Sequence, residues 1–292
     1  MSATAIPQRE IKARRIGFEP ERTTDKYFAA GDPIMSHVVA TLSALFPEGE
    51  DFFVESVKAY RSRITDPELK RQVSGFIGQE ALHSREHEAF NARLAELGFR
   101  TRGVDTFTRW LLGLVSATTP RSWQLAVTAA LEHYTATLAE VLLGDPEARG
   151  KITDEEIRSL LLWHAFEESE HKAVAFDVYA TAVGNERLRA AIMNLTTAIF
   201  LAVAIGWTTI GVVADGGTYR RPLRMLRGLA RLPASPWLRR DVIRRIRDYN
   251  RHGFHPDDHD ATALLEEWRP LLFGEAGQLA DRIQSNRAAA DA

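Results

Sequence analysis

The sequence predicts an all-α protein, and three observations lead to this prediction. Apolar residues recur at helical spacing over long stretches, residues that start helices precede these stretches, and no stretch of useful length alternates between polar and apolar residues. Two of the predicted helices carry the pattern Glu-x-x-His, at Glu80–His83 and at Glu168–His171. Residues three apart lie on one face of a helix, so each pair points in one direction. We therefore expect an antiparallel helical bundle with functional groups in its interior.

The composition limits the chemistry that the chain can use. Its 292 residues are 45% hydrophobic, which is enough for a large buried core. There is no cysteine, so disulfides, thiolate zinc sites and iron–sulfur clusters are excluded, and any metal must be held by carboxylates and imidazoles. Residues 1–33 are predicted to form an irregular N-terminal arm. Because residues 2–22 are polar and basic, we expect no secretory signal and a cytoplasmic location.

A helical hairpin is predicted to follow the arm. A short apolar helix covers residues 34–46, Pro47 ends it, and a second helix runs to Arg63. Asp66 is a typical N-cap and a proline follows it, so a long helix starts at this point. Gly98 is expected to end that helix.

A second hairpin is predicted after an irregular connection. Residues 99–119 form the connection, with a short helix around Trp110, and residues 120–143 form a long helix. Thr153, with a glutamate three residues later, makes a capping box. The helix that it starts is expected to reach about Val183.

The hairpin geometry selects a carboxylate on the helix before Glu80. Helices joined by a tight turn run antiparallel, so residues equally far from the turn lie at equal height. With Thr65 at the turn, Glu80 lies 15 residues beyond it and Glu50 lies 15 residues before it. Glu55 is five residues nearer the turn, which places it about 7.5 Å too low. We therefore expect Glu50 to face Glu80.

The second hairpin supplies the remaining carboxylate. Its turn lies near Gly150, and Glu132 and Glu168 each lie 18 residues from it. Glu132 stands in an apolar helix, where a carboxylate without a partner is costly to bury. One glutamate from each of two helices, with a Glu-x-x-His pair from each of two others, is the ligand set of ferritin-like di-metal proteins, and it implies a ferritin-like four-helix bundle. The predicted metal ligands are Glu50, Glu80, His83, Glu132, Glu168 and His171.

Further candidates stand beside this set. Glu167 competes with Glu168, because it is four residues before His171 and lies on an adjacent part of the helix face. The Glu-x-x-His pattern favours Glu168. Surplus histidines are also present, and we expect at least one of them to bind metal or to orient a ligand. The additional candidates are His87, His133, His164 and Glu167.

Several segments resemble the bacterial proteins catalogued as predicted metal-dependent hydrolases. These segments are Phe46–Phe53, Phe76–Glu80 with His83 and His87, His164–Asp177, and Gly253–Pro256. The resemblance extends over most of the chain, and it agrees with the choice of Glu50, which ends a Phe-Pro-x-Gly-Glu segment. One departure is the pair Asp257 and Asp258, which stands where the family has an aromatic residue. The resemblance implies a metal-dependent enzyme.

The second half of the chain adds an apolar stretch and a basic one. Residues 190–214 contain no charged residue, and this uncharged stretch is long enough to cross a bilayer. The alternatives are a fifth helix buried against the bundle, an apolar surface that meets membrane or substrate, and a membrane span. Residues 216–247 carry ten arginines and a single acid, and these arginines either lie on anionic headgroups or pair with acidic residues of the chain. No recognition motif accompanies them, so nucleic acid is not an expected partner.

The predicted organisation has four parts. An N-terminal arm over residues 1–33 precedes a di-metal bundle over residues 34–189. The long apolar helix follows at residues 190–214, and an Arg-rich helical extension over residues 215–292 packs on the bundle. The histidines at 252, 255 and 259 lie in a polar loop, where capping or solvation is the alternative to a second metal site.

The ligand set leads to two hypotheses for function. Four carboxylates with one imidazole per metal suit two iron ions, with manganese and zinc as the other candidates. The first hypothesis is a di-iron carboxylate oxidoreductase, an oxygenase acting on a hydrophobic or lipid-like substrate. The alternative is a metal-dependent hydrolase that uses a metal-bridging hydroxide. Iron storage is disfavoured, because the chain devotes over 100 residues to parts outside the bundle.

Partners and location follow from the same features. We expect a hydrophobic small-molecule substrate, an electron donor if the chemistry is oxygenation, and a homo-oligomer. The basic stretch beside the apolar one favours peripheral contact with an anionic membrane, at its inner face.

Overall fold

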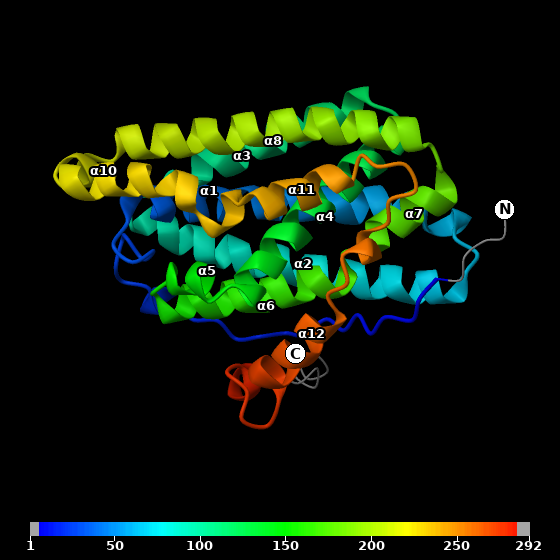
Figure 1. The fold of residues 1–292 in the computed structure, drawn as a ribbon, viewed down its shortest axis with the longest axis horizontal. Coiled ribbons are helices and arrows are strands. Elements are labelled where there is room, and N and C mark those ends of the chain that lie inside the picture. The colour runs from blue at the N-terminus through cyan, green and yellow to red at the C-terminus, as the bar shows by residue number, and fades with distance from the viewer. Residues whose placement is uncertain (1–5, 285–292) are drawn as a thin grey trace, which may run out of the picture.

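The computed structural model describes residues 6–284, and within this range the protein is all-α. No strand forms there, and the β-structure is limited to an isolated antiparallel bridge between Ile16 and Ile283. The helices pack as an elongated bundle (Figure 1). The predicted fold class is confirmed at this level, whereas the ferritin-like topology and the domain boundaries stay predictions. Residues 1–5 of the predicted arm and 285–292 of the predicted extension lie outside the described residues.

Four long helices and one shorter one build the interior. They are α1 (Pro33–Lys58), α2 (Pro67–Glu96), α4 (Arg121–Gly144), α6 (Glu155–His171) and α7 (Val174–Ala182). Helix α1 packs along α2, and α4 packs along α6 and α7. The helix is interrupted at Lys172 and Ala173, between α6 and α7. The single helix predicted to reach Val183 is therefore two helices.

The prediction that Pro47 ends a helix is wrong, because α1 continues through it. A proline inside a helix cannot donate to the carbonyl group four residues earlier, which in α1 belongs to Ser43. The side-chain amide of Asn91, on α2, donates to that carbonyl oxygen at 3.0 Å. The lost helical hydrogen bond is thus replaced from the neighbouring helix, and α1 reaches Lys58 instead of Arg63.

Two further predictions are wrong: the one for the connection between the two hairpins and the one for the N-cap of α6. Residues predicted as a connection with a short helix around Trp110 form α3 (Thr101–Thr118), a full helix whose small buried side includes Val104 while Trp110 is 60% exposed. The N-cap of α6 is Asp154, which accepts from the Ile157 amide, and not Thr153. The Thr153 hydroxyl instead donates to the Phe28 carbonyl.

The second half of the chain wraps the bundle. Its helices, with the short α5 that precedes them, are α5 (Pro146–Gly150), α8 (Glu186–Ala214), α9 (Gly216–Tyr219), α10 (Pro222–Arg231), α11 (Arg240–Asp248) and α12 (Thr262–Phe273). Short 3-10 turns lie at Pro20–Arg22, Arg61–Arg63, Leu232–Ala234, Pro236–Leu238, Pro256–Asp258 and Ala280–Arg282. Helix α8 runs along the upper edge of Figure 1 and α12 lies at the lower edge.

Helix α8 contains the predicted apolar stretch and starts earlier than predicted, at Glu186, with Asn185 as its N-cap. It packs on α1 and α4 with one side only. By length and composition it is the one helix within the described part of the chain that could cross a membrane, and only 6% of its most apolar window is buried. The alternative of a helix buried against the bundle is therefore wrong.

The N-terminal arm lies in an extended path along α2 and α6 (Figure 1). It is ordered by contacts and not by helix formation. The Arg9 guanidinium pairs with Asp177 on α7, and the Arg14 guanidinium pairs with Glu170 on α6. Gly75 on α2 allows the close approach, because a Cβ atom there would lie 2.5 Å from the Ile11 carbonyl oxygen.

Candidate metal centre

The six residues predicted as metal ligands meet in the interior of the bundle. Each of the helices α1, α2, α4 and α6 contributes at least one of them, and none is more than 3% exposed. Glu50 is buried as predicted, whereas the side chain of Glu55 is 72% exposed and pairs with Lys58. The height argument across the first hairpin thus selected the inward-facing glutamate. That these residues bind metal remains a prediction.

One half of the centre gathers around His171. Its Nε2 atom lies 3.0 Å from a carboxylate oxygen of Glu80, 3.4 Å from one of Glu132 and 3.7 Å from one of Glu168. One potential ligand atom from each of Glu80, Glu132 and His171 lies within 4.8 Å of the others. This spacing suits a single metal ion between them.

The other half gathers around His83. Its Nδ1 atom lies 3.6 Å from an oxygen of Glu80 and 3.6 Å from an oxygen of Glu168. Ligand atoms of Glu50, Glu80 and His83 also lie within 4.8 Å of one another. Glu80 belongs to both groups, and Glu168 lies near both histidines, so the two groups share carboxylates.

The polar atoms that face this interior fit metal ions. Both oxygens of Glu50, Glu80 and Glu132 are buried without a hydrogen-bond partner among the described residues, as is one oxygen of Glu168. The Nε2 atom of His171 has none either, because its short approach to Glu80 lacks hydrogen-bond geometry. Buried carboxylates without partners are costly, and divalent cations would satisfy them. Acceptor oxygens and imidazole nitrogens are the donor types that iron, manganese and zinc accept.

The second nitrogen of each histidine is held by a partner outside the centre. The Nε2 atom of His83 lies 3.2 Å from an oxygen of Glu167, and the Nδ1 atom of His171 lies 2.8 Å from the amide oxygen of Gln79. Such contacts fix the orientation and tautomer of metal-binding histidines. Of the two competing glutamates, Glu168 faces the centre and Glu167 stands behind His83.

Sequence reasoning did not identify the outer layer behind these partners. Gln79 donates to Glu170, and the Arg14 guanidinium pairs with both Glu167 and Glu170. Arg14 is buried and stacks against Phe166, with 5.1 Å between the guanidinium carbon and the ring centroid. The available signal was the placement of Gln79 and Glu170 directly beside ligand candidates in the sequence; Glu167 was already among the additional candidates.

Two of the surplus histidines line one end of the centre. The Nε2 atom of His164 lies 2.8 Å from Glu168 and 3.7 Å from Glu50, and its Nδ1 atom lies 2.7 Å from Nε2 of His87. His87 in turn contacts the Ser43 hydroxyl at 2.9 Å. The structure therefore places both imidazoles where they either bind metal or orient Glu168.

The remaining histidines lie elsewhere. His133 points away from its neighbour Glu132 and contacts the Arg245 carbonyl at 2.9 Å, so it is not part of the centre. In the polar loop, His255 pairs with Asp177 at 2.8 Å and caps the turn that follows it. The three loop histidines join none of the possible metal-binding groups among the described residues. Capping, the alternative named for this loop, is what His255 does.

Burial controls the protonation of the two outer carboxylates. It raises the pKa of Glu50 well above its usual value, and the nearby charge of Glu80 adds to this effect. Burial also raises the pKa of Glu132 to about 8, against the opposing charge of His171. In the absence of metal Glu132 therefore holds a proton near neutral pH, and the shift of Glu50 acts in the same direction.

The shared carboxylates and the histidines shift in the opposite sense. Burial acts to raise the pKa of Glu80 and Glu168, but the positive charge of the nearby His171 is the main opposing effect, and the pKa of both is lowered. Burial likewise acts to lower the pKa of His83 and His171, but the surrounding carboxylates raise both well above the usual value. Without metal, imidazolium groups thus balance the central carboxylates.

The comparison with known families agrees with this geometry. A sequence model of the family described as "Predicted metal-dependent hydrolase" matches residues 12–260. The matched range includes every residue of the candidate centre. Neither the search of curated proteins nor the search of solved structures finds a match.

Proposed function

The chain belongs to the family of predicted metal-dependent hydrolases, and from this membership we propose that it is a hydrolase with two metal ions in the interior of the bundle. The observation that carries the proposal is the set of buried carboxylate oxygens without hydrogen-bond partners, grouped around two imidazole nitrogens. Burying such a set of carboxylates without a cation would destabilise the folded protein. The family description and the donor set support the same class of chemistry.

In this proposal each residue has a distinct role. Glu50 and His83 would hold one metal ion and Glu132 and His171 would hold the other, while Glu80 and Glu168 lie near both histidines. The assignment follows from two of the four possible metal-binding groups among the described residues, in which Glu80 appears twice; the other two groups include His164, one of them with His87. Divalent ions at this position would supply Lewis acidity and a water molecule acidic enough to attack an ester or a phosphate near neutral pH.

The residues behind the ligands keep the site rigid. Glu167 and Gln79 hold the rings of His83 and His171 in place, so that one nitrogen of each ring faces the interior. His164 holds Glu168 through its 2.8 Å contact. We propose that the substrate is hydrophobic, because the apolar surface of α8 lies on the same bundle and would gather such molecules.

A second candidate is the oxygen-activating di-iron oxidoreductase. The observation that favours it is the ratio of four carboxylates to two primary imidazoles, which balances the charge of two divalent ions and suits iron. The two candidates share every ligand, so they differ in the metal and in the reaction. Substitution of a ligand would therefore affect both candidates alike.

Metal analysis combined with two assays separates the candidates. The purified protein is analysed for metal and tested on nitrophenyl esters and phosphates, before and after chelation and with each metal restored. The hydrolase proposal expects metal-dependent hydrolysis that disappears in His171→Ala and persists in Glu55→Ala, whose exposed glutamate lies on the same helix as Glu50. Absence of hydrolysis, together with rapid oxygen consumption by the anaerobically reduced iron form, would replace it with the oxidoreductase.

A further inference from the structure

The outward face of α8 is an apolar surface that nothing in the described structure covers. Its exposed large side chains are Leu195, Ile199, Leu201, Ile205, Ile210 and Val213. Across the same arc the other exposed positions are alanines with Asn194 and Thr209, so the face carries no charge. A contiguous surface of this kind along a helix is typical of an interaction site.

Neighbouring helices extend this surface. On α3, Trp110 and Leu114 are exposed, and the rings of Phe107 and Trp207 bring α3 against α8, with centroids 5.9 Å apart. Helix α10 follows α8 in the chain and folds back beside its end (Figure 1). It exposes three leucines at a spacing of three residues, which lie along one side of the helix: Leu223, Leu226 and Leu229.

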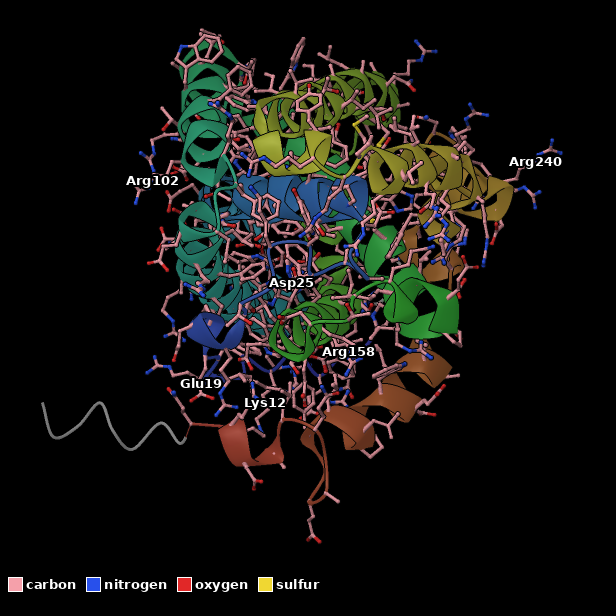
Figure 2. The ribbon with its side chains drawn as sticks, turned by 90° about the vertical axis from the view of Figure 1, so that its left-hand side faces the viewer. Lys12, Glu19, Asp25, Arg102, Arg158 and Arg240 are labelled. Carbon is pink, nitrogen blue, oxygen red and sulfur yellow. The ribbon has the colours of Figure 1, made fainter. Side chains whose placement is uncertain are left out.

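The Arg-rich stretch that follows α8 in the chain has few acidic partners. Of the ten arginines in residues 216–247, Arg239 and Arg245 form ion pairs, and Arg221 lies over the Tyr27 ring. The others have no ion pair within residues 6–284: Arg220, Arg224, Arg227, Arg231, Arg240, Arg244 and Arg247. Figure 2 shows Arg240 projecting outward on one side of the molecule and Arg102 on the other. Pairing with the chain's own acids thus accounts for only a minority of these charges.

We propose that α8, α3 and α10 form a docking surface for an anionic lipid membrane, with α8 lying in the plane of the headgroups. The apolar faces would enter the boundary between headgroups and acyl chains, and the arginines of this stretch would contact lipid phosphates. An apolar face next to a strip of arginines is the pattern of helices that lie on membranes. The proposal concerns a surface outside the metal centre and does not depend on which reaction occurs there.

The anchoring of α8 excludes a membrane span in this fold. At its first turn, the buried Arg189 donates to the carbonyl groups of Tyr249 and Arg251. At its end, Asp215 accepts from Lys26 at 3.0 Å and from the Tyr27 hydroxyl at 2.7 Å. Both ends are therefore tied to the same bundle, and crossing a bilayer would break both sets of contacts.

The arginines also disfavour a second copy of the chain as the occupant. In a twofold symmetric dimer the same patch faces itself, so the arginines of one copy would come close to those of the other. Like charges brought together without acids oppose association. Lipid phosphates, in contrast, supply the missing negative charge.

Vesicle flotation tests the proposal with the full-length protein. The expected result is flotation with vesicles of phosphatidylcholine mixed with phosphatidylglycerol, weaker flotation with phosphatidylcholine alone, and loss of binding in high salt. Replacing three arginines by glutamine (Arg227→Gln, Arg231→Gln, Arg240→Gln) should lower the partition coefficient roughly a hundredfold. Ile199→Glu with Ile205→Glu should abolish flotation, because it places charge on the apolar face.

A matched control removes the same charge elsewhere. Arg61→Gln, Lys70→Gln and Arg158→Gln together leave the docking surface intact, and Arg158 lies on the far half of the molecule from α8 (Figure 2). This control should float like the wild type, and circular dichroism should report the same helix content for all variants. No flotation of the wild type at low salt overturns the proposal. So does a stable dimer that Ile199→Glu dissociates, or a protein released only by detergent.

Discussion

The fine placement of residues on α6 illustrates what sequence spacing can and cannot decide. Glu167 and Glu168 are adjacent in sequence, yet one stands behind His83 and the other lies between His83 and His171. The Glu-x-x-His pattern selected the inner one. It could not assign a role to the outer one, because that role depends on the arm residue Arg14.

The first prediction concerns the two central histidines. His83→Ala or His171→Ala should lower the bound metal toward one ion or none, because each removes an inward-facing nitrogen of the centre. Metal analysis of the purified variants measures this. His133→Ala is the control, since that buried histidine contacts the Arg245 carbonyl instead. Two ions per chain in both central variants would show that the ligands have been assigned incorrectly.

The second prediction concerns Gln79, which orients His171. Gln79→Leu should weaken metal affinity about 10–100-fold while the fold is kept, because the imidazole loses the partner that holds its orientation. Gln72→Leu is a matched control on the same helix, since Gln72 is equally buried but bonds to Pro7 and Glu68. Competition with a coloured chelator measures the affinity. An equal loss in both variants would mean that Gln79 acts only through stability.

At the scale of helices, local signals predicted α2 well and α1 poorly. Asp66 and Gly98 mark the ends of α2, and the helix stays between them. Pro47 also gave a clear local signal, but Asn91 on another helix overrides it. Helix α3 was predicted only as a short helix around Trp110, for a different reason: its exposed side carries Trp110 and Leu114, so apolar residues do not mark its buried face. Tertiary contacts, which spacing alone does not contain, decide such cases.

The third prediction concerns the hydrogen bond from Asn91 that replaces the one lost at Pro47 in α1. Asn91→Ala should destabilise the protein by about 1–3 kcal/mol, because the Ser43 carbonyl would remain buried without a partner. Asn194→Ala is the comparison, since exposed Asn194 donates to a carbonyl of its own helix and accepts from the Asn250 side chain at the surface. That variant should change the unfolding free energy by less than about 0.5 kcal/mol. Urea denaturation gives both values, and similar values would contradict the proposed role of Asn91.

For the molecule as a whole, metal and protons compete for the same buried groups. The folded-state pKa of Glu132 is raised from 4.5 to about 8, and those of His83 and His171 are raised as well. A group with a raised folded-state pKa stabilises the protein fully below its unfolded pKa and loses this contribution as pH rises through the folded one. The metal-free protein should therefore lose stability as the pH rises from about 4.5 to 8. Metal should bind more tightly over the same range, because the ligands lose the protons that compete with it.

The fourth prediction is that the melting temperatures of loaded and chelated protein diverge as pH rises toward 8. Differential scanning calorimetry at several pH values measures the gap. Glu132→Gln removes one of the titrating groups, so the chelated variant should lose less stability than the chelated wild type over the same range. A gap that stays constant with pH, or narrows, would contradict a protonated Glu132 in the metal-free centre.

The extended path of the N-terminal arm has a consequence for exchange rates. Arg14 reaches from the arm to Glu167 and Glu170, and the Lys12 carbonyl accepts from Gln79. The arm thus fastens the supports of both central histidines from outside, although it supplies no ligand. Detachment of the arm would loosen both halves of the metal centre at once. The residence time of bound metal should therefore depend on how often the arm detaches. Slow, first-order release to excess chelator, with a rate independent of chelator concentration, would be the kinetic sign of that opening.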